Sequence, residues 1–275
     1  MKRDTSLLPL MPGELLHIGN GQLDIDIAPA AGGRIARMVF EGKPWLAGYD
    51  STNAAALNWG SYPMVPWAGR IRRGRFQFAG HDCVLPANLG VHAIHGVGFV
   101  LPWSVDARSA HAVDLSLQLP RDRRWPFGGV ARQRLSITGN TLRMVLSLTA
   151  GLHAMPRPVL GWHPWFHAPE RLEFTPTQCY PRDAEGVATL PLVAPPPRPW
   201  DDCFINTQPV VLHRAGQALR LSSDCDHWVI YDGRPDVIGV EPQGGPPDAF
   251  NLAPPPPLAP GETVAHWCLL EWMRD

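Results

Sequence analysis

The chain has 275 residues, of which 45% are hydrophobic and 18% are charged, a composition typical of a folded globular protein and not of a disordered one. Its 24 Lys and Arg residues balance 25 Asp and Glu residues to a formal net charge of -1, so no whole-chain field would attract nucleic acid or an anionic membrane. We therefore expect neither as a partner.

Short runs of alternating apolar and polar residues predict β-strands along most of the chain. The first run places Leu23, Ile25 and Ile27 on one face, and a later run repeats this alternation over 113–119. Similar apolar segments, separated by Gly, Pro, Asn or Asp, occupy 76–78, 142–148, 218–221, 228–231 and 264–272. Because no segment carries a long, capped helical stripe, we expect an all-β sandwich with few short helices.

The high content of glycine and proline also favours many turns and short elements. The 26 Gly and 31 Pro residues are too many for helix interiors. Two proline-rich segments, at 195–199 and 254–260, could be linkers between domains. Because both are short and strand-like segments resume after each, we predict that they are loops within a single domain covering residues 1–275.

The cysteines and the N-terminal residues bear on the cellular compartment of the protein. The five cysteines are odd in number and never spaced as a CxxC pair, so they indicate neither a disulfide framework nor a zinc knuckle and favour a reducing compartment. Asp4 and two prolines interrupt the apolar residues near the N-terminus, and no later run approaches membrane-spanning length. We expect a soluble, cytoplasmic protein.

The first candidate site segment is 58–80, which contains four arginines. Arg70 lies between small and apolar residues, and its five fixed donors suit a polyhydroxylated ligand or a carboxylate, with a structural ion pair as the alternative. Arg72, Arg73 and Arg75 are typical of a solvated turn and strand edge. They could also indicate an acidic sugar carrying phosphate, sulfonate or carboxylate, but a solvated face is the commoner meaning of such a run.

Histidines dominate the next two segments. His92 and His95 lie three residues apart in a glycine-rich loop, where a hydrogen-bonded pair is commoner than a metal site and a neutral imidazole can also bind a sugar hydroxyl. His163 lies among aromatic residues that favour its neutral form, so that it could act as an acid or base near neutrality or simply belong to the core. His163 and His167 form an HxxxH pair, but Pro164 argues against the helix that a metal site would need.

The fourth segment, 239–251, contains Glu241 directly after the apolar run 237–240 and before a proline-rich loop. A carboxylate at a strand end facing a cleft can act as a general base. The alternative is a solvent-facing glutamate at a turn.

These segments, in this order, resemble those of the aldose 1-epimerase (galactose mutarotase-like) family. In that family a segment like SYPMVPWAGRI carries a substrate-binding arginine, one like HAIHG a substrate-binding histidine, one like GWHPWF the catalytic histidine and one like EPQGGPPDAFN the catalytic glutamate. The resemblance implies that Arg70 and His95 bind substrate and that His163 and Glu241 are catalytic. A family aspartate that binds sugar hydroxyls is matched by Asp202 in WDDCF, with Asp201 as the alternative.

The resemblance extends from about Leu23 to the C-terminus, with two departures from the family pattern. The usual Asn before Arg-Ile is Gly69 here, and the residues around the aspartate fit loosely. Both bear on sugar preference and not on reaction type. The implied fold is a large antiparallel β-sandwich, the galactose mutarotase-like supersandwich, with the site in a concave groove on one sheet.

The resemblance implies the interconversion of α and β anomers of a free hexose or hexose derivative. The C1 hydroxyl must lose a proton while the ring oxygen gains one. With ordinary pKa values of about 4.3 for glutamate and about 6.5 for histidine, we expect Glu241 to be the base and His163 the acid. The two should face each other across the sugar, about one ring width apart, and no metal, nucleotide or redox cofactor is required.

The expected partner is a small-molecule sugar, and we expect a monomer or a homodimer. One of four tryptophans could stack on an apolar sugar face, namely Trp59, Trp67, Trp162 or Trp165. Two other classes of function remain open, a non-catalytic carbohydrate-binding protein on the same fold and a metal-dependent enzyme that uses some of the 11 histidines.

Overall fold

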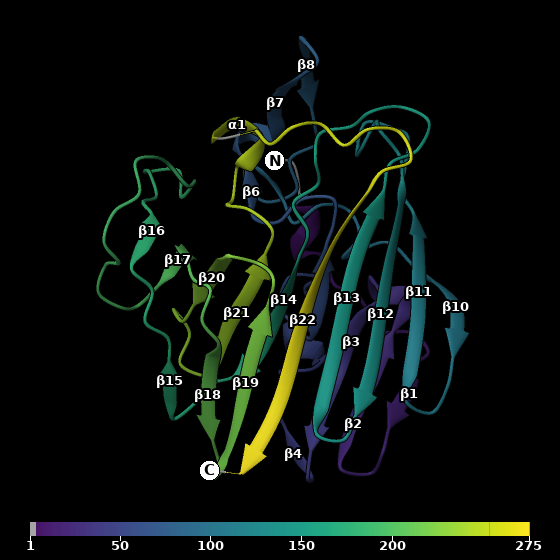
Figure 1. Ribbon diagram of the computed structural model, residues 1–275, viewed down its shortest axis with the longest axis vertical. Coiled ribbons are helices and arrows are strands. Elements are labelled where there is room, and N and C mark those ends of the chain that lie inside the picture. Colours follow the sequence, from purple (N-terminus) through teal and green to yellow (C-terminus); the bar gives the residue numbers. More distant parts are fainter. Residues whose placement is uncertain (1–3, 253, 275) are drawn as a thin grey trace.

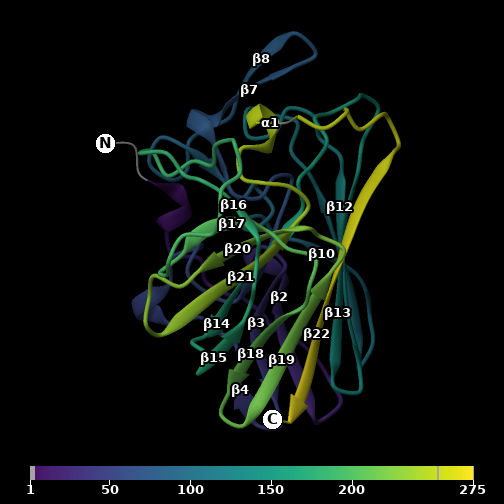
Figure 2. The same cartoon turned by 60° about the vertical axis from the view of Figure 1, so that its left-hand side comes forward.

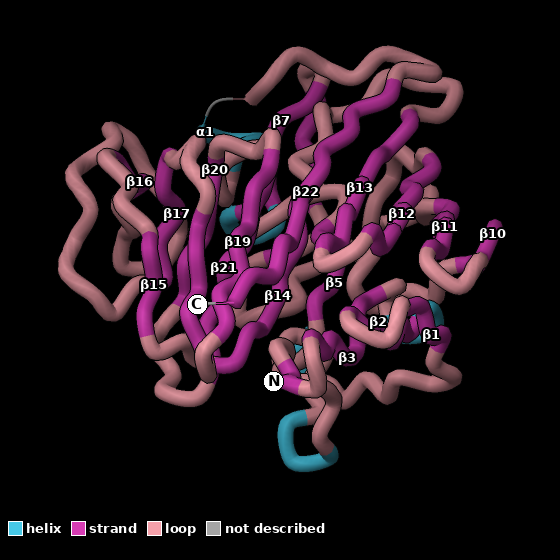
Figure 3. The backbone as a smooth tube through the Cα atoms, turned by 60° about the horizontal axis from the view of Figure 1, so that its bottom comes forward, coloured by secondary structure: helices cyan, strands magenta, loops and turns pink. Residues whose placement is uncertain are grey.

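A computed structural model describes residues 4–252 and 254–274. Strands are the main regular structure of these residues, and the few helical turns lie in the connections (Figure 3). The prediction of an all-β chain is therefore confirmed. The helical segments are four 3-10 turns, Thr5–Leu7, Pro29–Ala31, Ser51–Asn53 and Arg72–Gly74, and the short helix α1 (Ala249–Leu252).

The first of two large sheets has ten antiparallel strands. In spatial order it contains β1 (Leu16–Gly19), β2 (Leu23–Ala28), β3 (Arg34–Phe40), β5 (Ser61–Met64), β14 (Gly161–His167), β21 (Val237–Gln243), β20 (His227–Tyr231), β17 (Asp201–Ile205) and β16 (Gln178–Tyr180), with β4 (Lys43–Pro44) paired to β3. Strands from both halves of the sequence meet at its centre, where β5, β14 and β21 are neighbours.

The second large sheet has eight antiparallel strands. In spatial order it contains β10 (Ser104–Arg108), β11 (Ala112–Gln118), β12 (Val130–Thr138), β13 (Thr141–Thr149), β22 (Thr263–Arg274), β19 (Gln217–Ser223), β18 (Val210–Arg214) and β15 (Arg171–Glu173). The C-terminal strand β22 lies at the middle of this sheet (Figure 1).

Two short ladders extend the loops at one end of the molecule. The first pairs β6 (Arg70–Ile71) with β9 (Ala93–Ile94), and the second pairs β7 (Arg75–Phe78) with β8 (His81–Val84). The β7–β8 hairpin projects at the top of Figure 1, whereas β6 and β9 border the candidate site.

The two large sheets pack as the layers of a sandwich (Figure 2). Alternate residues of the strands point into the space between them, and residues such as Val113 and Leu115 of β11 are accordingly buried. The Phe40 ring of one sheet stacks on Trp272 of the other at 5.8 Å. Removal of this apolar surface from water is the main driving force for holding the layers together.

The strand predictions are confirmed along the chain. Each apolar run named above coincides, within a few residues, with β2, β7, β11, β13, β19, β20 or β22. The proline-rich segments 195–199 and 254–260 are loops, as predicted. No helix among residues 4–252 and 254–274 has the length and apolar character needed to cross a membrane.

Candidate active site

A cavity of about 270 Å³ opens on the outer face of the ten-stranded sheet, near the lower end of the size range of small-molecule sites. Its floor is formed by residues of β5, β14, β21, β20 and β17, and loops from other parts of the chain form its walls. Lining residues include Tyr62, Gly69, Arg70, His95, His163, Trp165, Tyr180, Arg182, Asp201, Cys203, Val229, Tyr231, Glu241 and Pro247.

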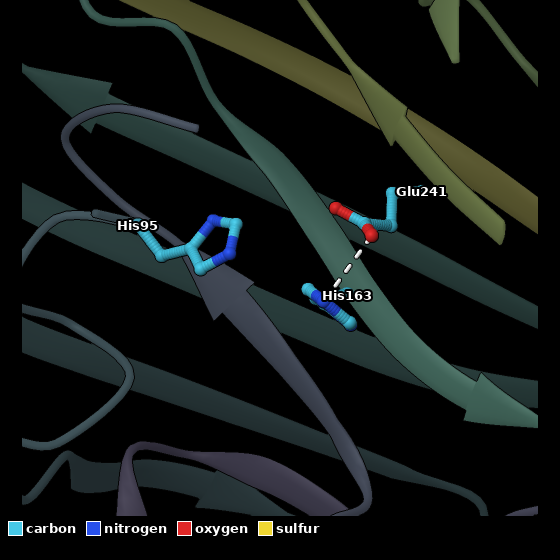
Figure 4. Close-up of side chains that lie close together, drawn as sticks. All are labelled: His95, His163 and Glu241. Atoms are coloured by element: carbon cyan, nitrogen blue, oxygen red, sulfur yellow. Dashed lines mark ion pairs between the residues drawn. The ribbon is translucent and has the colours of Figure 1, made fainter. Parts of the chain in front are cut away.

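Strand alternation places the two predicted catalytic residues on this floor. Trp162 points into the sandwich, where its Nε1 donates to Gln133 Oε1 at 3.1 Å, so the next residue, His163, points outward into the cavity. The β14–β21 register pairs Gly161 with Gln243 and therefore sets His163 directly opposite Glu241. Nε2 of His163 lies 3.1 Å from Oε1 of Glu241 (Figure 4).

This contact corrects two expectations. The predicted separation by one sugar ring is wrong, because directly opposed residues on adjacent strands have neighbouring side chains. Glu241 also lies within β21, which continues to Gln243, and not at the strand end. It is 3% exposed, which excludes the solvent-facing alternative.

Burial shifts the proton affinities of the pair in opposite directions. It raises the pKa of Glu241 well above its ordinary value, and the charge of Asp201 adds to this rise. It lowers the pKa of His163 to about 3. The order of pKa values assumed from the isolated side chains is thus inverted. Both shifts oppose charge formation, so they favour a protonated Glu241 beside a neutral His163, which is one proton between the two members.

His95 approaches the same pair from the loop after β9, and its ring centroid lies 5.2 Å from that of His163 (Figure 4). It adopts φ 57°, an uncommon conformation for a residue other than glycine. The Gly69 N–H donates to His95 Nδ1 at 3.2 Å, and the His95 N–H donates to the Gly69 carbonyl at 3.0 Å. In neutral His95 the remaining proton is therefore on Nε2, where it can be donated to a ligand oxygen.

The same hydrogen bond argues against a metal at this site. His95, His163 and Glu241 bring candidate ligand atoms within 4.8 Å of one another. In neutral His95, however, Nδ1 already accepts a hydrogen bond and Nε2 carries the proton, so neither nitrogen offers a free lone pair. A second group of candidate ligand atoms, from Asp224, Cys225 and His266, lies outside the cavity.

Arg70 also reaches the cavity, and its backbone is held by a residue that the sequence analysis missed. Arg70 forms no ion pair with any residue among 4–252 and 254–274, so the alternative that it forms a structural ion pair is not supported. The Asp248 N–H donates to the Arg70 carbonyl at 2.7 Å, and Asp248 Oδ1 accepts from the Arg72 N–H at 2.9 Å. Asp248 thereby holds the backbone of Arg70 and Arg72 without lining the cavity.

Of the two neighbouring aspartates, Asp201 lines the cavity and Asp202 does not. The cavity lining therefore favours Asp201, the alternative that the sequence left open, over Asp202. Arg182, another cavity residue, donates to Asp201 Oδ2 at 2.5 Å, and its Nε lies 3.4 Å from Asp202 Oδ1. The sequence offered no signal for Arg182, which lies in the long β16–β17 loop.

Of the four candidate tryptophans, Trp165 lines the cavity. Trp59, Trp67 and Trp162 are buried elsewhere, and their rings do not reach its surface. Tyr62 is a floor residue that the sequence analysis did not single out, although it lies within the SYPMVPWAGRI segment. Its ring stacks on that of His163 with a centroid distance of 4.8 Å.

The remaining polar candidates lie outside the cavity. Arg72 donates to Asp183 at 2.6 Å and Arg73 to Glu185, so these two arginines tie the β16–β17 loop to the 3-10 turn after β6. His92 Nδ1 accepts from the Arg73 N–H at 3.1 Å, which confirms that His92 is hydrogen-bonded. His167 lies in the strand β14, so the prediction that no helix carries the HxxxH pair is confirmed.

The fold and the acid/base pair on its outer face define a class, the galactose mutarotase-like β-sandwich proteins. Residues 14–271 match the sequence model of the family described as aldose 1-epimerase. The chain therefore belongs to the aldose 1-epimerase family, and the resemblance inferred from the four segments is confirmed.

Two curated relatives, both from Escherichia coli (strain K12), are the uncharacterized proteins YphB and YihR. They are 30% and 23% identical to this chain over 156 residues, covering 54% and 56% of it. The matches span 50% of each relative, so this chain aligns with about half the length of either.

Solved structures share the architecture over almost the whole chain. A galactose mutarotase-like protein from Clostridium acetobutylicum has a TM-score of 0.84 at 15% identity, with 97% of each chain covered. A GalM/aldose epimerase homologue from C. elegans has a TM-score of 0.82 at 17% identity, covering 95% of this chain and 99% of that one. Galactose 1-epimerase from Lactobacillus acidophilus NCFM has a TM-score of 0.78 at 16% identity, with 95% of each covered. At these identities the similarity establishes the fold alone.

Proposed function

We propose that the protein is an aldose 1-epimerase that interconverts the α and β anomers of a free hexose or hexose derivative in this cavity. The observation that carries the proposal is the contact between His163 and Glu241 on the floor of a sugar-sized cavity. Membership of the aldose 1-epimerase family supports the reaction type.

The reaction needs one proton acceptor and one proton donor, and the pair supplies both. In the reactive arrangement the proton resides on His163 and Glu241 is a carboxylate, a state reached by transfer across the 3.1 Å contact. Glu241 accepts the proton of the C1 hydroxyl, and a C1–O1 double bond forms as the bond from C1 to the ring oxygen breaks. His163 donates its proton to that oxygen, which keeps the bond's electron pair.

Rotation about the C1–C2 bond then exposes the other face of the aldehyde. The ring oxygen returns its proton to His163 and attacks C1, while Glu241 returns its proton to O1. The pair ends with the single proton it held at the start. Only protons move and one C–O bond breaks and re-forms, so the step needs no oxidant, reductant or nucleotide.

Four further side chains would bind the sugar. Arg70 and the Nε2–H of His95 supply donors for its oxygens, and Asp201 supplies an acceptor. Trp165 offers an aromatic face. Because Arg182 already donates to Asp201, we expect these two residues to share the same sugar hydroxyl region.

Exchange NMR or polarimetry on a pure anomer tests the proposal. Glu241→Gln and His163→Asn should each lower the catalysed rate by about 10² to 10⁴, the usual contribution of a general acid or base. The exposed residues Glu14 and His153 provide matched controls, because Glu14→Gln and His153→Asn change the same groups outside the cavity.

Normal rates in both site variants would refute the assignment. Calorimetric binding of a sugar to the wild-type chain without faster anomer exchange would favour a carbohydrate-binding protein instead. A panel of neutral and anionic sugars would identify the substrate.

A further inference from the structure

The ten-stranded sheet contains a fully buried arginine that the proposed reaction does not use. Arg34, the first residue of β3, is 0% exposed. Its guanidinium donates to four backbone carbonyls, those of Ala31 at 2.7 Å, Ala56 at 2.8 Å, Trp59 at 3.0 Å and Phe99 at 2.7 Å. No carboxylate pairs with it among the described residues 4–252 and 254–274.

A buried cation without a counter-ion needs an explanation, because removing its charge from water is strongly unfavourable. The four carbonyls satisfy its donors, yet dipoles do not neutralise its charge. Burial lowers the pKa of Arg34 to about 9, so the guanidinium stays charged at neutral pH. A net positive charge therefore persists inside the sheet.

This charge lies beside the proposed acid/base pair, on the same face of the sheet, because the β3–β5 register sets Arg34 opposite Tyr62 and the β5–β14 register pairs Tyr62 with His163. The Arg34 Cζ sits 5.0 Å from the ring centroid of Tyr62, and the Tyr62 ring stacks on His163 at 4.8 Å. The strand order explains the arrangement, because β5, which carries Tyr62, lies between β3 and β14. Arg34, Tyr62, His163 and Glu241 thus form a continuous series of contacts across four adjacent strands, from a buried position beside the cavity to the cavity floor.

We propose that Arg34 is a positioning residue whose buried charge, acting across Tyr62, sets the pH range over which the His163–Glu241 pair holds a single proton. The role of Arg34 in catalysis rests on the proposed epimerase function. The electrostatic effect itself concerns the ligand-free chain.

The sign of the effect follows from charge alone. A fixed positive charge disfavours every added proton, so it lowers both the pH at which the pair gains a second proton and the pH at which it loses its last one. Burial dominates the lowered pKa of His163, and Arg34 acts in the same direction.

The other groups around His163 do not replace this charge. Glu241 and His95 face it from β21 and from the loop after β9, and burial raises the pKa of Tyr62 so that its hydroxyl stays neutral. Arg70 and Asp201 act on the pair from the cavity side: Arg70 lowers the pKa of Glu241, and Asp201 raises it.

The structure also sets the size of the expected shift. The two ring spacings place the Arg34 charge within about 10 Å of the imidazole, and with an effective dielectric constant of about 20 this gives a shift of about one pH unit.

Arg34→Met, which keeps an unbranched but shorter side chain and removes the charge, tests the proposal. Both limbs of the pH profile of kcat/KM for anomer exchange should move upward by about one pH unit. The same shift should appear in the NMR titration of the His163 ring nitrogens in the ligand-free chain. Leu23→Ala, a buried substitution on β2 that carries no charge, should lower stability without moving either limb.

The outcomes separate this proposal from the proposed function. Unchanged limbs and an unchanged titration in Arg34→Met would overturn it and leave Arg34 with a structural role only. If that variant does not fold, Arg34→Gln, which retains two donors for the carbonyls, replaces it, and failure of both to fold would also overturn the proposal. A wild-type chain without epimerase activity but with the shifted titration in the variant would refute the function and support the role of Arg34.

Discussion

The shared proton of the His163–Glu241 pair predicts an unusual dependence of stability on pH. In the unfolded chain the glutamate releases its proton near about pH 4.3 and the histidine near about pH 6.5. In the folded chain the pair keeps one proton across the neutral range, because burial raises the pKa of Glu241 and lowers that of His163 to about 3. Between about pH 4.3 and 6.5 both states hold one proton, and the pair adds no pH dependence.

Above about pH 6.5 the two states differ. The unfolded chain then holds no proton at these two residues, whereas the folded chain still holds one. The free energy of unfolding therefore falls by about 1.4 kcal/mol for each pH unit, until the folded pair loses its proton. Over two units the loss is about 2.7 kcal/mol.

Glu241→Gln removes this loss, because the remaining His163 is neutral in both states above about pH 6.5. Urea unfolding of both proteins at about pH 6.5, 7.5 and 8.5 measures the effect, and the difference between them cancels the contributions of other titrating groups. We expect the variant to gain about 1.4 kcal/mol on the wild type for each pH unit of this range over which the folded pair keeps its proton. Parallel pH dependence would show that Glu241 is already ionised in the folded chain and would refute the one-proton description.

Two further substitutions test the cavity wall. Gly69→Ala introduces a Cβ only 2.6 Å from that of Pro247, at a residue with φ 67°. The resulting displacement of the cavity wall should raise KM by about tenfold or more. Gly21→Ala imposes the same left-handed backbone strain in open space, and an equal effect on KM there would contradict this explanation. Asp201→Asn should raise KM by about tenfold, as expected for a lost charge-assisted hydrogen bond, whereas Asp202→Asn should change it far less. Steady-state kinetics on the preferred sugar measures both, and the reverse ranking would restore Asp202 as the binding residue.

The four short sequence segments sufficed to recognise the family and its candidate residues. Arg70, His95, His163 and Glu241 were all identified from them, and all four line one cavity. Strand alternation was equally readable, because the inward-facing residues of a half-buried strand repeat with period two. These are local properties, and a sequence displays them directly.

The geometry of the site could not be read in the same way. His163 and Glu241 lie 78 positions apart in the chain, and their contact depends on the pairing register of β14 with β21. The choice of Asp201 over Asp202 likewise depends on which face of β17 forms the cavity floor. The pairing register of a strand, and the face of the sheet to which each side chain points, depend on long-range strand pairing, for which a single sequence carries little signal.

The difference between what the sequence shows and what the tertiary structure shows is clearest for the charges and pKa values of the site. From sequence, Glu241 and His163 have ordinary proton affinities, and Arg34 is one of 24 basic residues with nothing to distinguish it. Burial alone inverts the order of the first two pKa values and turns the third residue into an isolated interior charge. The sequence by itself thus determined which groups are present and on which strands they lie. Their distances and protonation depended on removal from water, which only the packed tertiary structure brings about.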